Sequence, residues 1–80
     1  MMEWIEEYKC YSARTPMFLL VVYEAHKDDW RGDVSYAAGG LRARVGLPYD
    51  DRSLRTADEA KAAIVAKVRE ILTKELEALG

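Results

Sequence analysis

Arg42 and Arg44, two arginines spaced two residues apart, have the clearest potential for binding chemistry in this sequence. They follow Gly39-Gly40 in SYAAGGLRARVGL, a stretch with the composition of two strands joined by a tight turn. Alternate residues of a strand share one face, so both guanidinium groups would point to the same side of a sheet. With Arg31 on the neighbouring strand, they would form a cationic face of the kind that sheet-based nucleic-acid-binding proteins use.

Acidic residues compete with that interpretation. Asp33 and Glu24 fall on the same face as the arginines in the expected register, and 12 Lys and Arg against 14 Asp and Glu give a net charge of −2. This balance argues against a general polyanion binder. The sequence therefore favours a solvated face, and nucleic-acid binding through Arg31, Arg42 and Arg44 is the alternative function.

Other reactive side chains lack the partners that their chemistry needs. The neighbours of the single histidine, His26, include three acids, Glu24, Asp28 and Asp29. These acids do not have the spacing of a known zinc or calcium site. The single cysteine, Cys10, would need a base fixed beside it to act as a nucleophile. We therefore expect no cofactor, no metal and no enzymatic activity.

The length and composition predict one small domain over residues 1–80. A chain of this size buries roughly 60% of the surface that its unfolded form exposes, so its core is small. One cysteine allows no internal disulfide, which fits a reducing cytoplasm. The N-terminal MMEWIEEY lacks the basic residues of a signal peptide, and the apolar run MFLLVV is too short to cross a membrane. We expect a cytoplasmic protein with no membrane partner.

Most of the chain before residue 48 has the composition of strands, expected at about 3–12, 17–26, 30–38 and 41–47. The stretch MFLLVVYEAH is rich in branched and aromatic residues and follows Pro16. Gly39-Gly40 can supply the positive φ angles of a two-residue hairpin turn. Asp28-Asp29 is expected to form the preceding turn, and a four-residue loop of the same parity is the alternative there. The first strand alternates less regularly, and a helical start at Trp4 is the alternative.

The last third predicts a long helix at about 57–79. Thr56 followed three residues later by Glu59 is a capping box, which marks the helix start. Apolar residues recur on one side, at Ala60, Ile64, Val68, Ile71, Leu72, Leu76 and Leu79. Such a helix is about 34 Å long, whereas four strands side by side span about 20 Å. The end that carries Leu76 and Leu79 is therefore expected to extend beyond the sheet.

These elements predict an α+β fold, a two-layer sandwich in which one C-terminal helix covers one face of an antiparallel meander of three or four strands (β-β-β-β-α). A two-residue turn at Gly39-Gly40 places Val34 opposite Val45 on the covered face. The turn at Asp28-Asp29 adds Val21 and Tyr23 to that face. Three residues of opposite parity, Phe18, Leu20 and Val22, would then form an apolar patch on the uncovered face.

An apolar patch and a projecting helix end are features of a protein that binds other polypeptides. The sequence predicts a non-enzymatic, self-associating protein-interaction module, with a homodimer or another protein as the partner. The expected interaction surface comprises Phe18, Leu20, Val22, Arg31, Arg42, Arg44, Leu76 and Leu79.

The order of elements from residue 17 to residue 72 ends in TADEAKAAIVAKVREIL, a helix opened by Thr, two residues and Glu-Ala. It resembles the partner-binding domain of HicB-type antitoxins and the arm-binding domain of some phage-type integrases, which implies a small interaction domain. The chain has GLPYDDRSL where the antitoxins have a Gly-Cys or similar motif, and it is less basic than the integrase domains. No functional residue is therefore carried over from either family.

Overall fold

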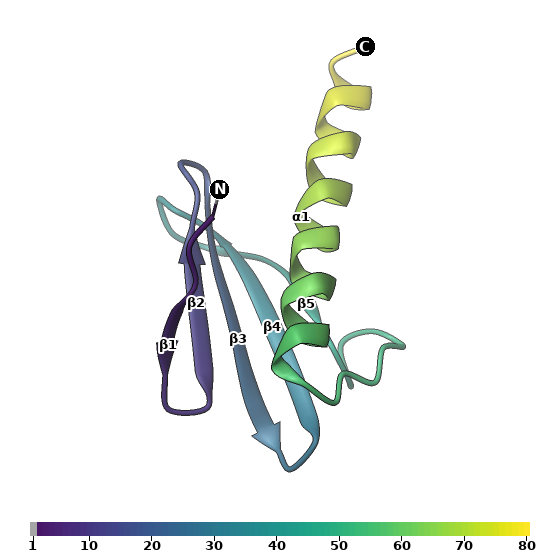
Figure 1. Ribbon diagram of the computed structural model, residues 1–80. Helices are drawn as coiled ribbons and strands as arrows, with labels where there is room; N and C mark the ends of the chain where they lie inside the picture. The colour runs from purple at the N-terminus through teal and green to yellow at the C-terminus, as the bar shows by residue number, and fades with distance from the viewer. Residues whose placement is uncertain (1) are drawn as a thin grey trace.

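A computed structural model describes residues 2–80 as one antiparallel sheet with a helix across one face (Figure 1). The five strands lie in the order β1-β2-β3-β4-β5, so each pairs only with its neighbours in sequence. The elements are β1 (Ile5–Glu7), β2 (Cys10–Arg14), β3 (Phe18–His26), β4 (Asp29–Tyr36), β5 (Leu41–Val45) and α1 (Ala57–Ala78). The predicted α+β architecture is confirmed, with one strand more than expected.

The additional strand arises at the N-terminus, where the region expected as one strand is a hairpin. Strands β1 and β2 meet at Tyr8-Lys9, and Glu7 pairs with Cys10. Lys9 has a positive φ of 51°. Glycine or asparagine usually occupies such a position and indicates a turn, and the sequence has neither here. The predicted pairing of this region with the next strand is confirmed, since Arg14 lies opposite Leu19. The helical alternative at Trp4 is wrong.

The predicted facing of β3 is also wrong. The turn after β3 lies at Lys27-Asp28, one residue earlier than expected, and the register of β3 against β4 shifts at a bulge between Glu24 and His26. One extra residue in a strand exchanges the faces of everything beyond it. Leu20 therefore lies opposite Val34 and faces the helix.

This correction reverses the predicted surface. Phe18, Leu20 and Val22 are fully buried and do not form an exposed patch. Val21 and Tyr23, expected beneath the helix, lie on the open face of the sheet and are half-buried there.

In the β4–β5 hairpin, the predicted residues face the helix, but the two strands pair in a different register from the predicted one. Gly39 and Gly40 have φ angles of 113° and 97°, which confirms the positive φ expected of them. The connection is nevertheless longer than two residues, because β4 ends at Tyr36 and β5 begins at Leu41. Val34 consequently lies opposite Ala43 and not opposite Val45. Both valines are still completely buried on the helix side, as predicted.

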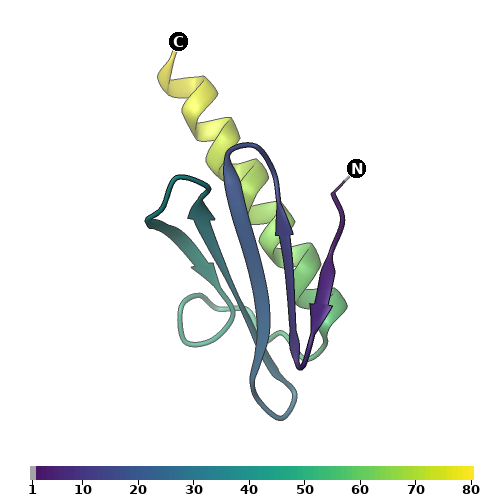
Figure 2. The ribbon, with the colours of Figure 1, turned by 90° about the vertical axis from the view of Figure 1, so that its left-hand side faces the viewer.

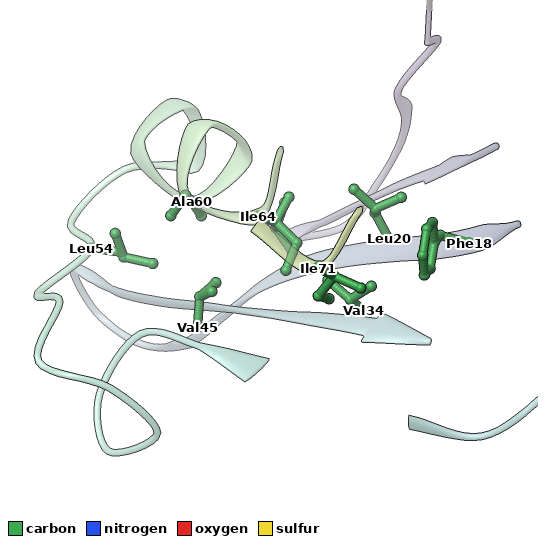
Figure 3. Close-up of a cluster of buried hydrophobic side chains, with 10 residues drawn as sticks. Phe18, Leu20, Val34, Val45, Leu54, Ala60, Ile64 and Ile71 are labelled. Atoms are coloured by element: carbon green, nitrogen blue, oxygen red, sulfur yellow. The ribbon is translucent and has the colours of Figure 1, made fainter. Parts of the chain in front are cut away.

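The core lies between the sheet and the first two thirds of α1, as Figure 3 shows. Strand residues Phe18, Leu20, Val34 and Val45 point toward Ala60, Ile64 and Ile71 of the helix, and Leu54 closes one end. The backbone of Leu54 is held by the N–H of Trp30, which donates to its carbonyl at 2.8 Å. The helix is thereby anchored to β4 just before it begins.

The start of α1 has the predicted cap. Thr56 Oγ1 accepts a hydrogen bond from the Glu59 N–H at 3.1 Å. The Glu59 carboxylate reaches back one residue further than in the usual capping box and accepts from the Arg55 N–H at 3.0 Å. Asp58 and Glu59 also place negative charge in the first turn, where the helix dipole favours it.

Candidate interaction site

The C-terminal part of α1 projects beyond the sheet. All four buried residues of the helix, Ala60, Ala63, Ile64 and Ile71, precede residue 72, and residues 72–80 are all exposed. Figures 1 and 2 show this segment rising past the turns of the sheet in two perpendicular views. The predicted overhang is confirmed. We call residues 72–80 the free end of the helix.

Three leucines lie exposed on the free end. Leu72, Leu76 and Leu79 have exposed fractions of 38%, 69% and 85%. Their spacing of four and then three residues places them on one side of the helix. We call this set the leucine stripe. It includes both helix residues that the sequence analysis named, and it adds Leu72, which that analysis assigned only to the apolar side of the helix.

An apolar hollow of about 190 Å³ continues the leucine stripe toward the sheet. Leu72 lies four residues after Val68 and seven after Val65, so all three share one side of the helix. The hollow is lined by Met2, Thr15, Leu20, Val65, Val68 and Arg69. The stripe and the hollow therefore form one continuous surface between the helix and the β2–β3 turn.

The opposite side of the helix carries two ion pairs. Glu70 forms an ion pair with Lys74 at 3.1 Å, as expected from their spacing of four residues, and a second ion pair with Lys67 at 3.2 Å. Both ammonium groups lower the pKa of Glu70, and the hydrogen bond from Lys74 has the larger effect. Glu70 precedes Leu72 by two residues, which is a rotation of about 200° around the helix. The helix thus separates a charged side from an apolar side.

Two of the three predicted arginines meet acidic partners on the open sheet face. Arg31 donates to Asp29 at 2.9 Å. Arg44 Nε lies 3.5 Å from Asp33 Oδ1, because these two residues are direct cross-strand neighbours. Both guanidinium groups also lie over the ring of Tyr49, at 5.9 Å for Arg31 and 4.7 Å for Arg44. Burial raises the pKa of Asp33, and Arg44 partly offsets that effect.

Arg42 differs from the other two arginines. It is exposed, and within residues 2–80 no carboxylate lies within ion-pair distance of its guanidinium. The open face therefore carries two compensated arginines and one uncompensated arginine, which leaves little local positive potential for binding a polyanion.

The remaining candidate side chains are not brought together. His26 is exposed at the end of β3, whereas Cys10 lies on β2, and burial raises the pKa of its thiol. Trp30 packs against the core, with its ring 6.1 Å from that of Tyr11. Across residues 2–80, no three His, Cys, Asp or Glu side chains gather into a group that could hold a metal ion. No helix in this part of the chain has the length and apolar character needed to cross a membrane.

The hollow is the feature that sequence reasoning missed. Its floor is Leu20, and the predicted register placed that residue on the other face of the sheet. A correct parity for β3 would have put Leu20 beneath Val65 and Val68. The hollow could therefore have been predicted only if the bulge between Glu24 and His26 had been recognised.

The chain was also compared with known proteins. No protein-family model matches it, and no curated protein or solved structure does so either. The resemblance to the antitoxin and integrase domains thus gains no support, and the function has to be argued from the surface just described.

Proposed function

We propose that this protein is a small, non-enzymatic protein-interaction module that associates with itself through the free end of α1. The observation that carries the proposal is the leucine stripe, with Leu76 and Leu79 more than two thirds exposed. Contiguous apolar surface on a soluble domain is commonly a contact site, because burying it against another chain removes it from water. The charged opposite side of the helix has no such tendency.

The surface is small, which sets the expected strength of the contact. The leucine stripe and the lining of the hollow together comprise nine residues, whereas a standard interface involves about 20–30 residues on each partner. We therefore propose a reversible monomer–dimer equilibrium rather than a permanent dimer. A cytoplasmic location belongs to the same proposal and rests on the single cysteine.

The test is the mass in solution of a variant that loses the stripe and keeps the helix. Leu76→Gln/Leu79→Gln removes two exposed apolar side chains, and Gln and Leu have similar helix propensities. In sedimentation velocity over a concentration series, the wild type should move from the 9.1 kDa monomer toward twice that mass. The variant should stay a monomer over the same range.

A matched control changes the other side of the same helical turns. Lys74→Gln/Glu77→Gln alters two exposed residues on that side and should self-associate like the wild type. A wild-type protein that remains a monomer at every concentration would refute the proposal, as would equal loss of association in both variants.

Nucleic-acid binding through Arg31, Arg42 and Arg44 is the second candidate. The observation in its favour is that Arg42 has no ion-pair partner among residues 2–80. A fluorescence titration with single- and double-stranded oligonucleotides at low ionic strength separates the two proposals. Because Asp29 and Asp33 compensate two of the arginines, we expect no binding. Salt-sensitive binding that Arg42→Glu/Arg44→Glu abolishes would establish the second candidate instead.

A further inference from the structure

We propose that two copies of this chain pack antiparallel about Leu72, so that the free end of α1 in each copy lies against residues 65–72 of the other and inserts Leu76 and Leu79 into its hollow. This inference rests on the proposed self-association and specifies its geometry. It follows from the self-complementary arrangement of apolar residues around Leu72.

The residues of the hollow and of the stripe are evenly spaced about Leu72. Val68 and Val65 precede it by four and seven residues, whereas Leu76 and Leu79 follow it by four and seven. At about 1.5 Å per residue, these positions lie about 6 Å and about 10 Å from Leu72 along the axis. A two-fold axis at Leu72 therefore brings Leu76 of one copy level with Val68 of the other, and Leu79 level with Val65.

The hollow has room for such an insertion. An apolar cavity of about 150 Å³ in another protein binds benzene. A hollow of about 190 Å³ can therefore accept a leucine side chain. Its lining is almost wholly apolar, so an entering leucine would displace water from Leu20, Val65 and Val68 without stranding a polar group.

The antiparallel arrangement also closes on itself. Each copy offers one stripe and one hollow, and the two-fold axis uses both at once. A second copy of this chain therefore matches this surface better than an unrelated polypeptide does. The second copy buries both the stripe and the hollow, whereas an unrelated polypeptide would bury only one of them.

The experiment is cross-linking with a short bismaleimide of about 10 Å reach in a Cys10→Ser background. Val65→Cys and Leu79→Cys are made on separate chains and tested alone and mixed. Two copies of Leu79→Cys in the antiparallel pair lie about 21 Å apart along the axis, so neither variant should cross-link alone. The mixture should yield the heterodimer, at least tenfold above the background set by Lys74→Cys, whose side chain lies about 160° around the helix from Leu72.

Each outcome decides the geometry. Heterodimer formed only in the mixture supports the antiparallel exchange. Leu79→Cys cross-linked to itself, or no cross-link above background in a sample that sedimentation shows to be dimeric, overturns this geometry and leaves self-association standing. A monomer at all concentrations overturns both proposals. Because single cysteines could weaken the dimer, each variant is sedimented before cross-linking.

Discussion

Leu20→Ala should lower the free energy of unfolding by about 2–5 kcal/mol, while Leu19→Ala, the same change one residue earlier, should cost about 1 kcal/mol or less. Leu20 has an exposed fraction of 1% and sits against Val34 beneath the helix. Leu19 is half-buried on the open face, opposite Ser35. Removing the Leu20 side chain leaves a cavity, whereas removing that of Leu19 leaves space that water can occupy.

Urea unfolding followed by circular dichroism measures both values, with Leu20→Val as a milder step in case Leu20→Ala does not fold. Comparable costs for the two alanine variants, or a larger cost for Leu19→Ala, would mean that β3 presents its other face to the helix. The pair therefore tests the register as directly as stability measurements allow.

Gly46→Ala should destabilise the protein by more than about 3 kcal/mol, through two effects that act together. Gly46 has a φ of 90°, in the region that side chains rarely adopt. An added Cβ would also lie 2.7 Å from the backbone oxygen of Trp30, and a backbone atom cannot rotate away. The chain must come this close because Gly46 directly follows β5 and begins the loop that returns to β4 at Leu54.

Gly40→Ala separates the two effects. Gly40 has a similar φ of 97°, but nothing lies within 4 Å of where its Cβ would be. We expect a loss of about 1 kcal/mol there, from the backbone conformation alone. Thermal unfolding of both variants provides the comparison, and a Gly46→Ala midpoint as high as that of Gly40→Ala would show that the loop can move away from β4.

Local signals in the sequence predicted the elements well. The cap at Thr56, the positive φ angles of Gly39 and Gly40, and the length of the helix each depend on a few adjacent residues. The facing of β3 depended instead on counting residues through a turn, and one unpaired residue near Ala25 changes the parity. No residue type in that stretch signals the bulge, so the sequence alone could not reveal which side of β3 is buried.

The candidate site shows the same division. The exposure of Leu76 and Leu79 followed from comparing the helix length with the sheet width, and the structure agrees. The hollow could not be predicted, because its floor and walls come from β3, the N-terminal segment and α1, whose relative placement depends on the register. The partner of Arg44 was missed for a related reason, since a register error of two residues placed Ser35 where Asp33 lies.

The strand order has a kinetic consequence. Each strand pairs with its neighbour in sequence, so the sheet can assemble through short loops, whose closure costs little entropy. Docking of α1 is the step that brings distant parts of the chain together. Until it occurs, Phe18, Leu20 and Val22 form an apolar strip on an uncovered sheet, which other unfinished chains can bind. The helix therefore sets the time during which a newly made molecule is prone to aggregate.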